Sequence, residues 1–298
     1  MMLIKKIIKT RRGGIMKETA ERTSQEHVPV FVLAEELLFI KLMSGKFQNN
    51  EVIRESLLAK ELGVSRRAMR EALCQAVGWG VVEYEPFKGF RICDFTLKML
   101  YDLAQLRDGI ETVSARHLAR NCGSREMNYL DDLMKAARVA VEKDDHVMNA
   151  ALDIVYHLQL VRLSGNAKFC SPGIVCYLMV LMNNSFGSYR YWYENEKKLR
   201  CMDYNEHLHY SENGSLQEHQ AVVDAIKKRD HELAATLAHL HIQWQLNYLE
   251  DAAQELGWDT KMSELPTNKT LRQEVETRRK VFEHVGLLLP ELLSDYKK

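Results

Sequence analysis

Hydrophobic and polar residues follow one another along this 298-residue chain mostly with the spacing of amphipathic helices. The pattern predicts a helix in VPVFVLAEELLFIKLMSGKF, ending near Ser44-Gly45, and a short helix in IRESLLAKELG, stopped by Gly63. A third helix is expected after Ser65, a good N-cap residue, and it runs to about Val77. Its apolar face is formed by Met69, Ala72, Leu73, Ala76 and Val77.

Beyond the third helix the period changes from helical to alternating. VVEY, PFKG and FRIC read as strand, turn and strand, which is the pattern of a small β-hairpin. Three helices followed by a hairpin is the layout of a winged helix-turn-helix. The sequence therefore predicts this DNA-binding fold at the N-terminal end.

From Thr96 onward the pattern is helical, and Thr96 is the expected N-cap of the first long helix. Further helices are predicted at 124–143, 145–163, 168–186, 215–229, 230–256 and 269–288. The fold class is therefore mainly α: an N-terminal winged helix-turn-helix and a C-terminal all-α helical bundle.

Four segments follow from this pattern. They are a flexible basic arm at 1–27, a winged helix-turn-helix at 28–95, a helical ligand-binding domain at 96–256 and a helical extension at 257–298. The segment before Met16 is either a disordered arm that attracts DNA or an over-extended start, and the second reading is simpler. A polar, aromatic-flecked stretch lies between Ser188 and Asn213 and interrupts the helices.

Composition narrows the class of protein. The 41 basic and 41 acidic residues cancel, so any surface that attracts nucleic acid has to be local. The six cysteines form no C-x-x-C pair, which favours reduced thiols and a cytoplasmic location. There is no signal-peptide core and no apolar run of about 20 residues, so no membrane span is expected.

The third helix carries a basic face made of Arg66, Arg67 and Arg70, three and four residues apart. Arginine's planar fork reaches both guanine and phosphate, and Ser65 can donate to a phosphate. Lys88 and Gly89 at the hairpin tip are expected to form the wing. The alternative is a solvated surface helix, but that reading leaves the preceding turn and the following hairpin unexplained.

A second group of polar residues lies in apolar surroundings. Asp153 and His157, one helical turn apart, sit in a helix that is apolar nearly all round. His219 shares a stripe with Leu216, Val222, Val223 and Ile226, and His241 shares one with Leu233, Leu237, Leu240, Trp244 and Tyr248.

An antiparallel hairpin would bring His219 and His241 level, since each lies nine or ten residues from the turn, or about 15 Å. His239 falls off its helix's apolar stripe, so His241 is preferred. One aspartate and three histidines suit a divalent transition metal such as Zn²⁺, Ni²⁺ or Mn²⁺. From spacing alone, four separate core residues remain an equal alternative.

The segment IRESLLAKELGVSRRAMREAL, followed by GWGVVEYEPFKGFRI, resembles the winged helix of the GntR superfamily of bacterial transcription regulators. The matching positions are Ile53, Glu55, Leu58, Ala59, Gly63, Val64, Ser65, Arg66, Arg70, Glu71, Ala72, Leu73 and Gly89. The resemblance implies that Arg66 and Arg70 contact bases and phosphates. Ser56, Arg67 and Ala68 depart from the pattern, which leaves the operator sequence open.

The second half resembles the effector domain of the FadR-type GntR subgroup, the FCD domain. Asp153-x-x-x-His157 followed by SGN, then EHQAVVDAIKKRD and a histidine 22 positions after His219, carry this likeness. In that family these four positions hold the metal. Arg107 and Glu111 match a family R-x-x-x-E, so Arg107 is a candidate for binding a ligand carboxylate, with a salt bridge to Glu111 or Asp108 as the equal alternative.

These observations predict a transcription regulator that has no catalytic residues and binds its operator as a homodimer. Its expected partners are a palindromic double-stranded DNA operator and a small carboxylate effector, and its expected role is repression of an organic-acid or sugar-acid operon. Two alternatives remain at this stage. One is a helical-bundle metalloenzyme using the aspartate and three histidines, and the other is a regulator with a metal-free, acyl-type effector pocket.

Overall fold

The computed structural model describes residues 30–43, 47–171, 173–178, 180–181, 212–264 and 280–281. It consists of two compact units, one reaching to Cys93 and the other from Asp94 to Val281. The predicted arm at 1–27, the 188–213 stretch and nearly all of the predicted helix 269–288 lie outside the described residues. Of the predicted helix 168–186, residues 173–178 and 180–181 are described and helical.

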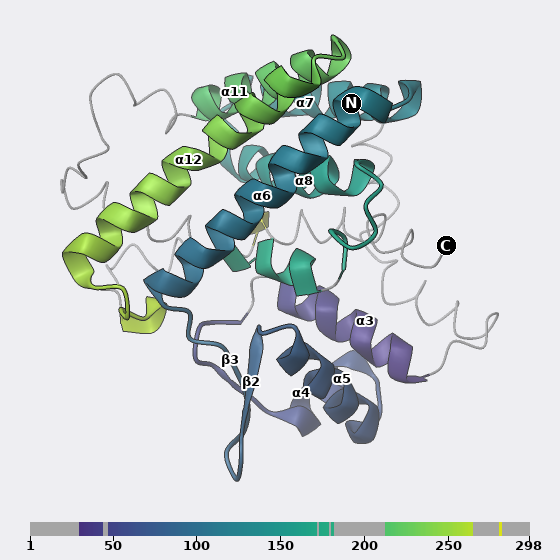
Figure 1. Ribbon diagram of the computed structural model, residues 1–298. Coiled ribbons are helices and arrows are strands. Elements are labelled where there is room, and N and C mark those ends of the chain that lie inside the picture. Colours follow the sequence, from purple (N-terminus) through teal and green to yellow (C-terminus); the bar gives the residue numbers. More distant parts are fainter. Residues whose placement is uncertain are drawn as a thin grey trace. The chain divides into compact units, whose positions relative to one another are not determined.

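The first unit contains α3 (Val30–Met43), α4 (Glu55–Leu62) and α5 (Arg66–Gly78) (Figure 1). Strands β2 (Val82–Glu85) and β3 (Gly89–Ile92) form the predicted antiparallel hairpin, with Tyr84 opposite Phe90. A two-residue strand, β1 (Val52–Ile53), adds to the other edge of β3 and gives a sheet of order β1-β3-β2. The predicted helices and hairpin are confirmed, while β1 is too short for a periodicity argument to detect.

The junction between α4 and α5 is built as the sequence predicts. Gly63 ends α4 in the left-handed conformation at φ +69°, which a glycine adopts without steric cost. The Ser65 hydroxyl oxygen accepts a hydrogen bond of 3.1 Å from the backbone N–H of Ala68 and caps α5. The buried face of α5 includes Ala68, whereas Val77 is exposed. The prediction for Val77 was wrong because the helix's buried face is centred nearer Ala68 and Ala72.

The second unit is a helical bundle, as predicted. Its helices are α6 (Leu97–Asn121), α7 (Ser124–Glu142), α8 (His146–Leu163), α11 (Glu212–Lys227) and α12 (His231–Leu256), with a 3-10 turn at Met262–Glu264. Helix α8 is buried around most of its circumference, as its apolar sequence indicates. Thr96, Asp145 and Asp230 cap α6, α8 and α12 through their side chains.

Helices α6 and α12 lie side by side and pack along much of their length (Figure 1). The buried residues of α12 include five alanines, namely Ala234, Ala235, Ala238, Ala252 and Ala253. The predicted leucine stripe is only partly buried, because Leu233 is 43% and Leu240 is 57% exposed. That prediction was wrong for Leu233 and Leu240: the buried positions in this part of α12 are held by Ala234, Ala235 and Ala238. The larger buried residues of the helix come after His241, namely Ile242, Leu246, Tyr248 and Leu249.

The chain after α12 returns to the start of α6. The backbone N–H groups of Leu97 and Lys98 donate to the carbonyls of Thr260 and Trp258 at 3.0 and 2.9 Å. The rings of Tyr101 and Trp258 meet edge to face at 5.2 Å. These contacts fix the first turn of α6, and hence the orientation of the helix that carries Arg107. Among the described residues, no helix is both long and apolar enough to cross a membrane.

Candidate metal centre and DNA-binding surface

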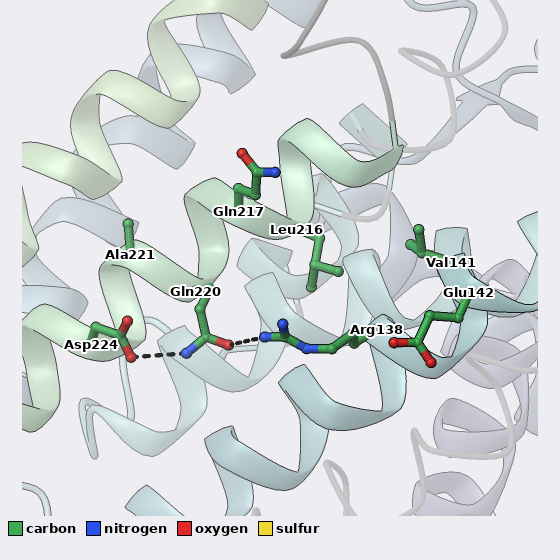
Figure 2. A pocket seen from close by; sticks show the side chains of 8 residues that line it. All are labelled: Arg138, Val141, Glu142, Leu216, Gln217, Gln220, Ala221 and Asp224. Carbon is green, nitrogen blue, oxygen red and sulfur yellow. Dashed lines mark hydrogen bonds between the residues drawn. The ribbon is translucent and has the colours of Figure 1, made fainter.

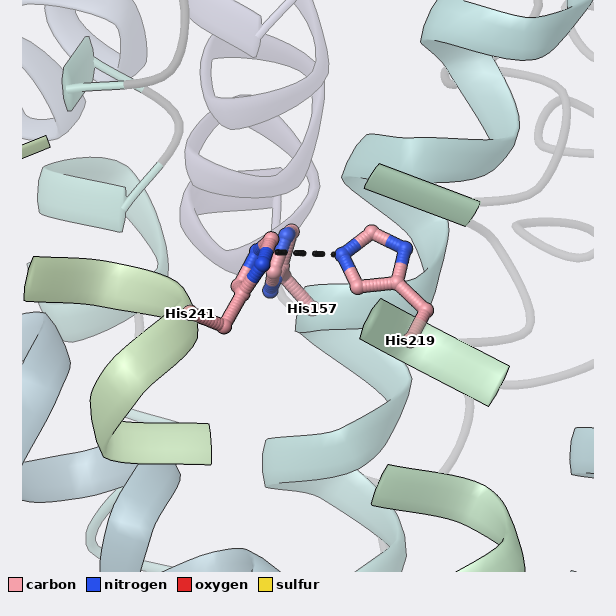
Figure 3. Close-up of side chains that lie close together, drawn as sticks. All are labelled: His157, His219 and His241. Carbon is pink, nitrogen blue, oxygen red and sulfur yellow. Dashed lines mark hydrogen bonds between the residues drawn. The ribbon is translucent and has the colours of Figure 1, made fainter. Parts of the chain in front are cut away.

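Three buried histidines from three helices meet inside the second unit. His157 comes from α8, His219 from α11 and His241 from α12, and their rings point toward one another (Figure 3). One ring nitrogen from each lies within 4.8 Å of the others. Such convergence of titratable groups in a core is costly unless hydrogen bonds or a bound ion stabilise it.

The α11–α12 hairpin sets the distance between two of these rings. Arg229, at φ +61°, and the cap residue Asp230 turn the chain between the helices. The Nε2 atoms of His219 and His241 then lie 3.1 Å apart, so the two histidines are level, as their distances from the turn predict. His239 instead lies at the surface with its Nδ1 2.9 Å from Asp108.

Carboxylates hold the outer nitrogens of two rings. The Nδ1 atom of His157 lies 2.7 Å from Oε2 of Glu111, and Nδ1 of His241 lies 2.7 Å from Oε2 of Glu218. An N–H at Nδ1 that donates to a carboxylate leaves Nε2 as the lone-pair nitrogen of a neutral imidazole. Carboxylates in this position orient metal-ligating histidines and raise their basicity.

Asp153 borders the histidines from α8. Its carboxylate oxygens lie 4.0 Å from Nε2 of His157 and 3.8 Å from Nε2 of His219. The hydroxyl of Ser215 donates to Oδ1 of Asp153 at 2.9 Å. All four metal-ligand candidates predicted from the sequence therefore belong to one cluster, and it presents three imidazole nitrogens and a carboxylate.

The protonation state of the rings follows from their burial. Burial lowers the pKa of His157 and of His219 well below the ordinary value, and the charges of His241 and Arg107 act in the same direction. The ring of Tyr156 stacks on His219 with centroids 3.9 Å apart and excludes water from that side. Both imidazoles are therefore neutral near pH 7, which is the form that ligates a metal.

The donor set fits a divalent transition metal. Three imidazoles and a carboxylate are ligands that Zn²⁺, Ni²⁺ and Mn²⁺ accept, and the neutral rings of His157 and His219 need not lose a proton to bind. The carboxylates on Nδ1 supply the outer support that such sites have. The Nε2 atoms of His219 and His241 lie within hydrogen-bonding distance of each other, so the rings also satisfy one another in the absence of an ion.

Arg107 is buried beside this cluster. Its Nε donates to Oε1 of Glu111 at 2.7 Å, and its Nη1 donates to Oε1 of Gln245 at 2.9 Å. Burial raises the pKa of the Glu111 carboxyl, and the Arg107 guanidinium opposes this shift. The salt bridge that the sequence left as an alternative is thus formed with Glu111. Asp108 pairs with His239.

Two members of this network, Gln245 and Glu218, could not be predicted from the sequence. Gln245 reads as one more polar residue among apolar neighbours, and its partner Arg107 is 138 positions away. Glu218 precedes His219 and reads as surface charge, yet it holds His241 across the helix pair. The single available signal was that each lies on or next to a stripe bearing a metal-ligand candidate.

A surface pocket of about 500 Å³ lies between α7 and α11 (Figure 2). Arg138 donates to Gln220 at 3.3 Å, and Gln220 donates to Asp224 at 2.9 Å, so these polar groups bond to one another along its wall. Leu216 and Val141 add apolar lining. The pocket gathers no histidine or cysteine, and the histidine cluster is therefore the stronger candidate for a ligand site.

In the first unit, the three arginines of the predicted basic face of α5 differ in how far their side chains are exposed. The Arg67 side chain is 90% exposed and pairs with Glu71 at 3.1 Å. Arg70 is 50% exposed, donates to Glu55 at 3.0 Å and lies over the rings of Tyr84 and Phe90. Arg66 approaches Glu55 at 3.9 Å. Arg66 and Arg67 can therefore reach outward, while Arg70 joins α4, α5 and the hairpin.

The predicted wing is the turn between β2 and β3. Lys88 pairs with Glu85 at 2.5 Å, and Gly89 has φ +87° with open space around it. The Ser65 hydroxyl oxygen accepts the capping hydrogen bond of α5. Its O–H can therefore still donate to an acceptor outside the protein, such as a phosphate oxygen. The six DNA-contact candidates thus occupy the first turns of α5 and the hairpin tip.

Two family models match this chain, one in each unit. The family described as "Bacterial regulatory proteins, gntR family" matches residues 33–92, and the FCD domain matches residues 102–243. A probable D-xylose utilization operon transcriptional repressor of Paenarthrobacter nicotinovorans is 24% identical over 51% of this chain and 66% of its own length. The gluconate operon transcriptional repressor of Bacillus licheniformis is 21% identical over 72% of this chain and 82% of its own.

The solved structure of E. coli McbR/YncC has the same fold, with a TM-score of 0.54 and 19% identity over 76% of this chain and 99% of that one. The gntR match lies within the first unit and the FCD match lies within the second. The chain belongs to the GntR family of bacterial transcription regulators, with an FCD domain, and is a DNA-binding regulator rather than an enzyme.

Proposed function

We propose that this regulator binds a divalent transition metal at Asp153, His157, His219 and His241, and that a small carboxylate effector bound there changes its affinity for DNA. The observation that carries the proposal is the convergence of three buried imidazoles, whose ligand nitrogens lie within 4.8 Å of one another. Carboxylates on the outer nitrogens of His157 and His241 support it. Carboxylates in this position are the outer support that metal-ligating histidines commonly have.

The effector class follows from charge. A bound divalent ion supplies a Lewis-acid anchor for a carboxylate, and Arg107 adds a second positive group on the far side of Glu111. The named relatives act on xylose-utilization and gluconate operons, and gluconate is itself a sugar acid. An organic acid or sugar acid is therefore the proposed effector, and repression of its catabolic operon is the proposed role.

The proposed response requires two copies of the chain on one operator. A homodimer presents two α5 helices to the two halves of a palindromic site. The effector changes DNA affinity only as far as it binds the two arrangements of those helices unequally. The proposal thus predicts a reciprocal effect, in which bound DNA also changes the affinity for the effector.

The metal half is tested by calorimetric titration of chelator-treated protein with Zn²⁺, Ni²⁺ and Mn²⁺. Wild type is expected to bind one ion per chain, and His219→Ala is expected to lose at least ten-fold in affinity. His239→Ala is the matched control, because His239 lies on the same helix pair but outside the cluster. Equal affinities for wild type and His219→Ala would remove the metal from the proposal and favour an effector pocket without metal.

The DNA half is tested with duplexes that wild type selects from a pool of random 30-base-pair sequences. Arg66→Ala is expected to weaken binding to the selected duplex by about ten-fold or more, the effect of losing one base-contacting arginine. Binding is measured at two salt concentrations, since phosphate contacts make affinity fall with salt. Salt-independent binding that survives both Arg66→Ala and Arg70→Ala would contradict the assignment of α5.

A further inference from the structure

Phe87 stands fully exposed at the tip of the β2–β3 hairpin. It is an aromatic residue with no packing partner on the protein among the described residues, since its whole side-chain surface is accessible. The turn projects away from α4 and α5 in Figure 1. A large apolar side chain in such a place gains nothing from the fold of the free protein.

The backbone at this position makes the choice of phenylalanine more costly. The N–H of Lys88 donates to the carbonyl of Glu85 at 3.1 Å and closes a turn with Pro86 second and Phe87 third. Phe87 has φ +68°. Proline followed by a residue of positive φ is the pattern of a type II turn, whose third position favours glycine or asparagine. Strain retained without a packing gain points to a function outside the fold.

The base of the hairpin is fixed against the recognition helix. The rings of Tyr84 and Phe90 lie 4.9 Å apart across β2 and β3, and the guanidinium of Arg70 lies 5.8 and 5.7 Å from their centres. Phe87 lies three residues beyond Tyr84, or about 10 Å along an extended strand. That reach is comparable with the width of one DNA groove, about 12 Å, so with α5 in the major groove the tip would come to the edge of that groove, next to the minor groove.

The surroundings of Phe87 favour DNA over a protein partner. Lys88 and Gly89 follow it directly, and a lone aromatic between a proline and a lysine makes no contiguous apolar patch of the kind that protein interfaces need. An apolar side chain followed by a cation suits the minor groove, once Lys88 exchanges its ion pair with Glu85 for one with a phosphate. There the cation meets phosphate, and the apolar group enters between base pairs.

We propose that Phe87 is an apolar wedge that enters the minor groove beside the bases read by α5 and partly unstacks one base step. The proposal rests on the proposed DNA contacts of α5. Steps that unstack easily, TA and CA/TG, are expected at that position of the site. Phe87 then contributes specificity through the deformability of the DNA, without a hydrogen bond to any base.

The test compares wild type with Phe87→Gly, Phe87→Leu and Lys88→Ala on the duplex that wild type selects from the random pool. Phe87→Gly removes the wedge and also relieves the positive φ, so the free protein is expected to unfold at a higher urea concentration. Phe87→Leu keeps an apolar wedge. Affinity is measured over a salt series, and unstacking is followed by the fluorescence of 2-aminopurine placed at successive flanking positions.

Phe87→Gly is expected to bind about ten-fold more weakly or worse, which is the range for loss of one stacked base contact. Its salt dependence should match that of wild type, and the 2-aminopurine signal at one step should disappear. Phe87→Leu should keep most of both. Lys88→Ala should instead lower the slope of affinity against salt by about one unit.

Equal affinity and equal 2-aminopurine fluorescence for wild type and Phe87→Gly would overturn the wedge. If Arg66→Ala still weakens binding in that case, the DNA-contact proposal for α5 stands alone. If Phe87→Gly changes the slope of DNA affinity against salt concentration, Phe87 acts by supporting phosphate contacts. That result would also overturn the wedge. Selection of no duplex by wild type would overturn both proposals together.

Discussion

The Nδ1 atom of His157 lies 2.7 Å from Oε2 of Glu111, although 46 residues separate them in the sequence. The other oxygen of the same carboxylate accepts from Nε of Arg107. Glu111 therefore joins the candidate metal ligand on α8 to the candidate carboxylate-binding arginine on α6. A ligand that moves Arg107 must also change the hydrogen bond that orients His157.

Replacement of Glu111 by glutamine should separate this link from the metal ligands themselves. The amide cannot hold the imidazole as a carboxylate does, and we expect metal affinity to fall by about 10- to 100-fold. Arg107 also loses its buried counter-charge, so the free energy of unfolding of the metal-free protein should fall by about 3 kcal/mol. Calorimetric metal titration and urea unfolding measure the two effects.

Glu218→Gln is the matched variant, because Glu218 holds His241 as Glu111 holds His157. Its side chain is 23% exposed, against 1% for Glu111. A similar loss of metal affinity with a smaller loss of stability is expected. Equal metal affinity in wild type and in both variants would contradict the role given to these carboxylates.

The stability of the metal-free protein should depend on pH through the buried histidines. Burial lowers the pKa of His157 and His219 well below the ordinary value, so between that lowered pKa and about 6.5 only the unfolded chain binds these protons. The contribution is fully present above pH 6.5 and is lost as the pH falls. We expect a loss of about 1.4 kcal/mol per histidine per pH unit below 6.5.

Urea unfolding in the presence of chelator at pH 7.5, 6.5 and 5.5 measures this dependence. His219→Gln removes one of the two protons, so its curve should be shallower below pH 6.5 than that of wild type. His239→Gln is the surface comparison, because His239 lies outside the cluster. Identical slopes in all three proteins would mean that the cluster does not titrate on unfolding.

Much of the fold could be predicted from the sequence because its signals are local. Gly63, Ser65 and Thr96 end or begin helices through their own backbone conformation or side chain. The alternation in VVEY and FRIC is likewise contained within the strands that it predicts. Strand β1 has two residues, too few to show a period, and exists because β3 has a free edge to pair with.

The candidate site was predictable in its ligands but not in its supports. Asp153 and His157 stand out because they are polar residues in a helix that is apolar nearly all round, and such a helix is expected to be buried. His219 and His241 could be paired because a hairpin fixes their relative heights. The bonds from Arg107 to Gln245 and from Glu218 to His241 depend on how the helices are rotated about their axes, which the spacing along a single helix does not determine.

Helix rotation also explains the error in the leucine stripe of α12, and it leads to a stability prediction. Ala238 is buried, and a leucine there should overpack the bundle and lower the free energy of unfolding by about 1–3 kcal/mol. Leu240→Ala, at an exposed position of the same helix, should change stability by less than about 0.5 kcal/mol. Urea unfolding measures the loss of stability in each variant. A larger loss for Leu240→Ala than for Ala238→Leu would mean that α12 buries its leucines, as the sequence pattern predicted.

At two glycines of the winged helix, substitution by alanine changes stability through the backbone conformation alone. A β-carbon at Gly63 or at Gly78 would meet no atom within 4 Å, so neither substitution creates a clash. Gly63 has φ +69° and ends α4, whereas Gly78 is helical and ends α5. Gly63→Ala should lower the free energy of unfolding by about 1 kcal/mol, because alanine is strained at positive φ.

Gly78→Ala should have the opposite sign. Alanine loses less backbone entropy than glycine on entering a helix, so the free energy of unfolding should rise by about 0.5 kcal/mol. Thermal and urea unfolding of the two single variants and the double variant measure the difference. Their effects should add, because each acts through its own backbone conformation. A gain in stability for Gly63→Ala would show that α4 ends without a left-handed residue, and the turn into α5 would then need another explanation.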